Sequence, residues 1–214
     1  ALAAEGAKVA VAGRTLATLE ETCAEIRRRG GTAMAVTCDV MSQEDIDRCV
    51  AEVVSHFGGL QILVNNAHVV PLGRLLDVSD EVFMQGIDSG PLATLRMMRA
   101  AYPHLKGDGA IINLASSAAV RWDASGYSLY GATKEAIRSI SRGAACEWGV
   151  DGIRVNVIAP HALSPGLKGW IDSNPTEAEA FFNSIPLRRV GECEDDIGRT
   201  VAFLVSDNAR YLTG

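Results

Sequence analysis

Strand-like and helix-like segments alternate along this chain, and this alternation restricts the possible fold more than any other feature. The strand-like segments are short and rich in alanine and β-branched residues, and glycines follow several of the helix-like ones. We expect strands over 8–12, 32–38, 60–64, 110–115 and 153–159, and helices over about 15–29, 42–57, 82–104, 127–148 and 192–205. This pattern predicts an α/β fold with a doubly wound parallel sheet, in which ligands bind beyond the carboxyl ends of the strands.

Composition narrows the class of protein. With 214 residues, 48% of them apolar, the chain can bury one core, and we expect one domain over 1–214. A net charge of −6 leaves no basic face for a nucleic acid. Neither an apolar run of roughly 18 residues nor the pattern of a signal peptide is visible. The five cysteines are scattered, which favours reduced thiols over a zinc site or a disulfide framework. We therefore expect a cytoplasmic protein that binds neither nucleic acid nor a membrane.

Tyr130 and Lys134 are the first candidates for chemistry. They lie four residues apart on a predicted helix and so share one face. Deprotonation of a tyrosine with a pKa near 10 costs roughly 4 kcal/mol at neutral pH. An ammonium one helical turn away stabilises the phenolate. Ser117 ends the strand over 110–115, so its hydroxyl can orient a substrate carbonyl while Tyr130 transfers a proton. The alternatives are a surface helix pair for Tyr130 and Lys134, and a cap or loop role for Ser117, with Ser116 as its competitor.

The connection from 160 to about 190 is long for this kind of fold. Its aromatic residues favour a substrate lid over about 161–190, and an apolar-bodied substrate is expected from four side chains: Trp122, Trp170, Phe181 and Phe182.

An ordered set of short motifs resembles the short-chain dehydrogenase/reductase family, whose fold is Rossmann-like. The similarity covers essentially the whole chain and is nearest to the 3-oxoacyl-carrier-protein reductase-like branch. It rests on Cys38-Asp39-Val40, Leu63-Val64-Asn65-Asn66-Ala67, Ser117, Tyr130-Gly131-Ala132-Thr133-Lys134, Ile153-Arg154-Val155-Asn156 and the ending from Phe203 to Gly214.

The resemblance implies hydride transfer between a nicotinamide and a carbonyl or alcohol carbon. Tyr130 is then the acid/base, Ser117 holds the substrate oxygen, and Lys134 binds the nicotinamide ribose and lowers the pKa of Tyr130. The remaining cofactor contacts that it implies are Asp39 and Val40 at the adenine, Asn66 and Ala67 along the groove, and Leu163 near the carboxamide.

Cofactor choice can be argued from charge. Members that use NAD resemble one another in an acidic residue at the end of the second strand. Here Gly13 and Arg14 occupy this place, and a guanidinium suits the 2′-phosphate of NADP(H). We expect NADP(H) rather than NAD, with a solvated arginine as the alternative.

The chain departs from the family at its start. The expected first strand and glycine-rich phosphate loop, roughly 20 residues, are missing, and so is the closing strand after Gly214. The missing first strand belongs between 8–12 and 60–64, which would otherwise stand roughly 9.6 Å apart. We therefore expect that this chain alone neither folds stably nor turns over NADPH.

Three positions depart from the family motifs. His68 and His161 stand where glycine is usual, and the asparagine that completes the catalytic set is replaced near Ser89 or Gly90. The missing asparagine puts the efficiency of the proton relay in doubt. We interpret the two histidines as larger side chains that are tolerated where glycine is usual. The alternative is that they form a pair that acts as an auxiliary acid/base or binds a metal.

Two functional hypotheses follow. The first is an NADP(H)-dependent carbonyl reductase or alcohol dehydrogenase acting on a small molecule. The second is a catalytically silent dinucleotide-binding regulator, which the altered motifs motivate and the intact Ser117, Tyr130 and Lys134 oppose. The resemblance also implies a homotetramer or dimer, packed through the helices over 82–104 and 127–148.

Overall fold

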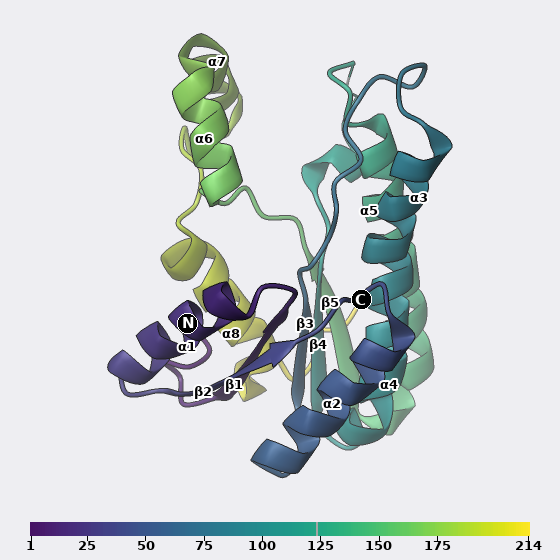
Figure 1. The fold of residues 1–214 in the computed structure, drawn as a ribbon, viewed down its shortest axis with the longest axis vertical. Helices are drawn as coiled ribbons and strands as arrows, with labels where there is room; N and C mark the ends of the chain where they lie inside the picture. Colours follow the sequence, from purple (N-terminus) through teal and green to yellow (C-terminus); the bar gives the residue numbers. More distant parts are fainter. Residues whose placement is uncertain (123) are drawn as a thin grey trace.

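The computed structural model of this chain describes residues 1–122 and 124–214 and has the expected α/β architecture (Figure 1). Its strands are β1 (Lys8–Gly13), β2 (Thr32–Thr37), β3 (Ile62–Asn65), β4 (Gly109–Leu114) and β5 (Ile153–Ile158). All of the strand pairs are parallel. Because each crossover carries a helix, the alternation in the sequence leads to the predicted parallel, Rossmann-like fold.

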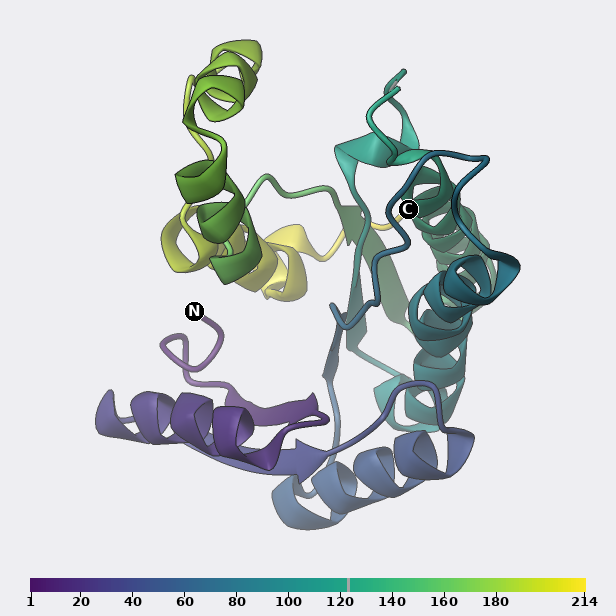
Figure 2. The same cartoon turned by 45° about the horizontal axis from the view of Figure 1, so that its top comes forward.

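The strands form two sheets rather than one. β1 pairs with β2, whereas β3, β4 and β5 form a second sheet in that order. Within the described residues no ladder joins β1 to β3, and Figure 2 shows the two sheets set apart. This break falls where the sequence predicts that two strands lack a partner between them.

Helix α2 (Gln43–Phe57) connects the two sheets through its apolar face. Its buried residues Ile46, Val50 and Val53 belong to the same core cluster as Val36 of β2, and Leu63 of β3 packs against this cluster. The Ser42 side chain accepts a hydrogen bond from the Asp45 amide, which confirms the predicted start of the helix.

The other long helices also match their predicted ranges. They are α1 (Leu16–Arg28) and α5 (Ser128–Trp148). Thr15 precedes α1, but its side chain makes no capping hydrogen bond. A second core cluster joins Met98 and Leu105 to Ile111 of β4, Ala144 of α5 and Val155 of β5. The fully buried faces of β4 explain its almost wholly apolar sequence.

The helix expected over 82–104 is interrupted. The chain forms α3 (Asp80–Ile87), a π-helical turn at Asp88–Leu92 and α4 (Ala93–Leu105). Pro91 lies inside the π turn, and a proline has no amide proton for the hydrogen bond of a regular α-helix. The last predicted helix is divided similarly, into a π turn at Cys193–Gly198 and α8 (Arg199–Val205).

The connection after β5 is more regular than the sequence indicates. It contains α6 (Pro165–Ser173) and α7 (Pro175–Ser184), each of which begins with a proline that needs no amide partner there. Figure 1 shows both helices projecting away from the sheets. All five cysteines are free, as expected. Among the residues described, no helix combines the length and apolar character that a membrane crossing requires.

Candidate active site

The candidate site lies where β3, β4 and β5 end and α5 begins. After β4 the chain turns through a short 3-10 helix at Ser117–Ala119, and the Ser116 side chain caps it by accepting from the Ala118 amide. This turn packs closely against α5. A Cβ atom on Gly131 would lie 2.5 Å from the Ala118 carbonyl oxygen, so only glycine allows the approach. The motif glycine thus brings the two serines toward the first turn of α5.

Tyr130 is half-buried between two aromatic rings. The His68 ring stacks on it with centroids 5.6 Å apart, and Tyr127 meets it edge-on at 6.2 Å. Burial raises the pKa of Tyr130 above its ordinary value, while a hydrogen bond with the Ser116 side chain lowers it in part. The phenol therefore holds its proton in the free chain.

Lys134 lies one turn further along α5 and is 4% exposed. Its ammonium donates to the Leu114 carbonyl at 2.7 Å and lies 5.6 Å from the centroid of the Tyr130 ring. Burial alone lowers the pKa of Lys134 to about 8. In this state the pKa of Tyr130 is shifted by burial, by Ser116 and by Tyr127, and the role of Lys134 in lowering it stays a prediction.

Ser116 and Ser117 interact with different side chains, which the sequence does not indicate. Ser116, the alternative to Ser117, acts on Tyr130 by lowering the pKa of its phenol. The Ser117 hydroxyl instead lies 2.8 Å from Nε2 of His161, which follows β5. The structure therefore brings Tyr130 and Lys134 together, and it places Ser117 at the same sheet edge with His161 as its partner.

His68 occupies space that opens because residue 90 is glycine. A Cβ atom on Gly90 would lie 2.5 Å from His68 Nε2, which contacts the Gly86 carbonyl oxygen at 3.0 Å. Burial is the largest cause that lowers the pKa of His68 to about 4. Its Nδ1 atom is buried and has no hydrogen-bond partner in the described part of the chain. The nearby Ser89 hydroxyl accepts from the Val69 amide at 2.9 Å and so fixes the loop after β3.

Asn113 is a site residue that the sequence analysis missed. Fully buried in β4, it donates to the Ser141 hydroxyl at 2.8 Å and accepts from Asn65 of β3 at 2.8 Å. Its amide joins β4 to β3 and to α5, three of the elements that end or begin at the site. The sequence could have indicated it, because Asn113 is a polar residue within the apolar run 110–115 and a buried amide needs hydrogen-bond partners.

The predicted cofactor contacts lie at the carboxyl ends of the strands. Arg14 follows β1 and is exposed, and no hydrogen bond or ion pair of its side chain occurs within residues 1–122 and 124–214. The Asp39 carboxylate, after β2, accepts from the Met41 amide at 3.0 Å. Val40 packs against the α2 cluster, whereas Asn66 and Ala67 are exposed after β3.

These residues fit a nicotinamide nucleotide in their chemistry. Arg14 offers a free guanidinium for a phosphate. Lys134 uses one of its three N–H donors on Leu114, so two remain for ribose hydroxyls. Leu163, near the end of β5, donates its amide to the Gly191 carbonyl at 2.8 Å, which fixes the start of the α6–α7 segment.

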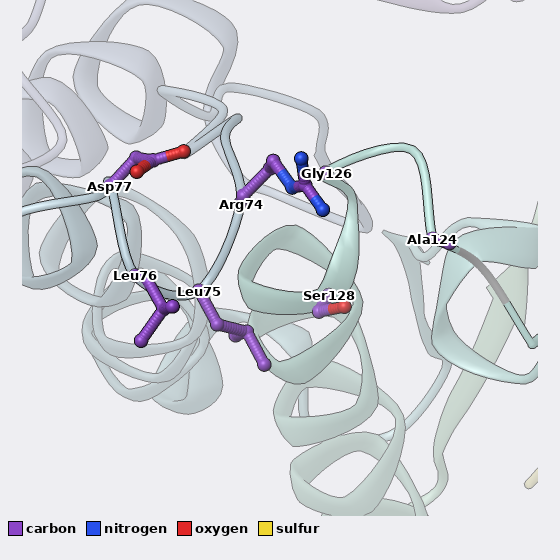
Figure 3. Close-up of a pocket in the computed structure, with 7 residues that line it drawn as sticks. All are labelled: Arg74, Leu75, Leu76, Asp77, Ala124, Gly126 and Ser128. Carbon is purple, nitrogen blue, oxygen red and sulfur yellow. The ribbon is translucent and has the colours of Figure 1, made fainter.

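Aromatic residues and a cavity flank the site. Phe181 of α7 contacts the His161 ring at 5.6 Å and the Trp170 ring at 6.1 Å. Trp122 is fully exposed, outside this cluster. A cavity of about 520 Å³ lies between the loop after β3 and the start of α5, and Figure 3 shows Arg74 pointing toward Gly126 there. Its lining residues are Arg74, Leu75, Leu76, Asp77, Ala124, Gly126 and Ser128.

Comparison with known proteins agrees with this geometry. The whole chain, residues 1–214, matches the family model described as Enoyl-(Acyl carrier protein) reductase. A 12alpha-hydroxysteroid dehydrogenase from a Clostridium species is 37% identical over all of this chain and 85% of its own length. The 3-oxoacyl-(acyl-carrier-protein) reductase FabG of Staphylococcus aureus is 34% identical over all of this chain and 86% of its own length. The crystal structure of a short chain dehydrogenase from Burkholderia cenocepacia in complex with NADP is 30% identical. It superposes with a TM-score of 0.88 and covers 99% of this chain and 85% of that one.

The fold and these similarities define an NAD(P)-dependent oxidoreductase. More narrowly, the chain belongs to the short-chain dehydrogenase/reductase family, as its motifs predict.

Proposed function

We propose that this protein transfers a hydride between NADP(H) and a carbonyl or alcohol substrate, with Tyr130 as the catalytic acid/base. The observation that carries the proposal is the packing around the Tyr130 phenol. A buried ammonium lies 5.6 Å from its ring centroid, and the Ser116 side chain lowers the pKa of its hydroxyl. A protein that only bound nucleotides would not require this arrangement.

In the direction of reduction, a nucleotide held by Arg14 and Lys134 would supply the hydride to the carbonyl carbon. Tyr130 gives its proton to the carbonyl oxygen as negative charge develops there. The resulting phenolate is stabilised by the Ser116 side chain, and the Lys134 ammonium lies 5.6 Å from the centroid of its ring. Ser117 orients the substrate oxygen by donating a hydrogen bond from its hydroxyl. In oxidation the Tyr130 phenolate removes the alcohol proton.

The preference for NADP(H) rests on Arg14. Its exposed guanidinium lies at the end of β1, and no carboxylate binds it in the described part of the chain. A solved relative that contains NADP supports the same choice. Asp39, Val40, Asn66, Ala67 and Leu163 are proposed to line the rest of the nucleotide site, and Lys134 to bind its ribose.

The α6–α7 segment is proposed to be the substrate lid. Its aromatic side chains, Trp170, Phe181 and Phe182, pack on one another and reach the His161 ring at the site. Apolar surface of this kind favours a substrate with a large apolar body. The relative that acts on hydroxysteroids is consistent with such a substrate.

Association into a homotetramer or dimer is proposed to place α4 and α5 at the interface. Light scattering during size-exclusion chromatography gives the mass in solution directly. A mass of one subunit at micromolar concentrations would contradict the association.

Turnover of a panel of ketones by the full-length protein with NADPH tests the function. We expect oxidation of NADPH with at least one apolar ketone, and a loss of kcat of about 1000-fold or more in Tyr130→Phe, because proton transfer is removed. The affinity for NADPH is expected to stay within about 3-fold of the wild-type value, since a ring of the same shape remains. Equal turnover by the Tyr130→Phe variant would contradict the proposed role of Tyr130.

A further inference from the structure

The hydrogen bond between Ser117 and His161 is a contact at the site that the proposed chemistry leaves unused. Ser117 Oγ lies 2.8 Å from His161 Nε2, and both side chains are half-buried at the ends of β4 and β5. A serine hydroxyl has one proton to donate and two lone pairs that accept. The direction of this hydrogen bond therefore decides whether Ser117 can donate to anything else.

Two arrangements are possible, and they differ in consequence. If Nε2 accepts from Ser117, the only hydroxyl proton is used, and the substrate oxygen receives no donor. If Nε2 carries a proton and donates it, Ser117 accepts this bond and its own O–H can point at the substrate oxygen. A hydroxyl that already accepts a hydrogen bond is also polarised and donates more strongly.

We propose that His161, with a proton on Nε2, is a positioning residue that polarises Ser117 toward the substrate oxygen. The inference rests on the proposed function, because it assigns Ser117 the oxygen of the substrate. His161 touches the reaction only through Ser117.

The surroundings of His161 hold its ring in place and connect it to the α6–α7 segment. Its carbonyl accepts from the Gly191 amide at 2.8 Å, and the next residue, Ala162, forms a parallel bridge with Gly191. Phe181 of α7 packs against the imidazole ring at 5.6 Å. The orientation of the Ser117 hydroxyl is thus coupled to the position of α7.

Two variants of nearly equal shape test the direction of the hydrogen bond. His161→Gln keeps an N–H that can donate to Ser117, whereas His161→Glu offers a carboxylate that only accepts. We expect kcat to fall by less than about 5-fold in His161→Gln. In His161→Glu we expect a fall of about 100-fold, comparable to Ser117→Ala, because the donor to the substrate oxygen is lost. Equal losses in both variants would overturn the proposal, since a ring that only fills space does not distinguish an amide from a carboxylate.

The tautomer of His161 gives a readout that needs neither cofactor nor substrate. Long-range nitrogen–proton correlation spectra of the protein labelled with ¹⁵N-histidine distinguish Nε2–H from Nδ1–H rings, and the signal missing from His161→Gln identifies His161. We expect the Nε2–H form, and a ring protonated only on Nδ1 would overturn the inference.

The activity of the variants distinguishes a failure of the proposed function from a failure of the role of His161. If Tyr130→Phe turns over ketones as fast as the wild type, the proposed function is wrong whatever the tautomer. If Tyr130→Phe is inactive while the glutamine and glutamate variants behave alike, only the role of His161 is wrong.

Discussion

Replacing Lys134 by methionine tests how strongly burial of the ammonium opposes folding. Burial lowers the pKa of Lys134 from 10.5 to about 8. At roughly 1.4 kcal/mol for each pH unit, the buried charge costs about 3 kcal/mol at neutral pH. Methionine removes this cost but leaves the Leu114 carbonyl without its donor, a loss of about 1 kcal/mol. We expect Lys134→Met to be about 2 kcal/mol more stable than the wild type at pH 7, although it loses activity.

The sign of the pH dependence follows from proton binding. Between pH 8 and 10.5 the unfolded chain keeps the proton that the folded chain has released, so wild-type stability rises with pH through this range. Methionine does not ionise, so the stability of Lys134→Met lacks this pH dependence. Its advantage should therefore shrink by about 2 kcal/mol between pH 8 and pH 9.5, which urea unfolding at several pH values, without nucleotide, measures.

Lys106→Met is the matched control for this prediction. Lys106 also lies over a tyrosine ring, 4.8 Å from the centroid of Tyr102, but it is exposed and pairs with Asp151 at 3.2 Å. Its pKa is raised, chiefly through bonding with Tyr102 and Asp151, so its removal should give no gain in stability. A Lys134→Met variant that is less stable than wild type at pH 7, or whose advantage does not change with pH, would refute the reasoning.

Three further predictions concern the packing and charge around the site. Gly131→Ala should lose about 1–3 kcal/mol of stability and most of the activity, because its Cβ would press on the Ala118 carbonyl; Gly143→Ala, on the same helix with open space around it, should gain about 0.5–1 kcal/mol. Thermal unfolding compares the two, and equal effects would contradict the close contact. Asn113→Leu should lower the free energy of unfolding in urea by about 2–4 kcal/mol, because Asn65 and Ser141 lose their hydrogen-bond partner. An unchanged free energy of unfolding would show that these hydrogen bonds do not stabilise the protein. Arg14→Ser should raise the KM for NADPH by about 10–100-fold and leave that for NADH nearly unchanged; parallel changes in both would argue against a 2′-phosphate contact.

The parallel fold could be predicted because its signals are local. Glycines after helices, apolar strands and the Ser42 cap each specify their own segment, and the resulting order follows from the parallel crossovers. The π turn at Asp88–Leu92 escaped prediction, since Pro91 alone does not tell a kink from a π-helical turn. The α6 and α7 helices were missed because Pro165 and Pro175 read equally well as loop residues and as first residues of helices.

The site was predicted as a set of residues but not as a set of contacts. Tyr130 and Lys134 share a helix, so their proximity follows from spacing. The partners of Ser116 and Ser117 depend on how the turn after β4 packs on α5 and on the residues that follow β5. Likewise, the space for His68 opens only because Gly90, on another element, has no side chain.

The pH dependence of kcat/KM for alcohol oxidation by the wild type and by Ser116→Ala measures the role of Tyr130 most directly. The Ser116 hydrogen bond lowers the pKa of Tyr130, so its removal should move the midpoint of the rising limb to higher pH. The height of the plateau should change little, because the phenolate remains the base. An unchanged midpoint would mean that Tyr130 is not the group whose ionisation controls the reaction.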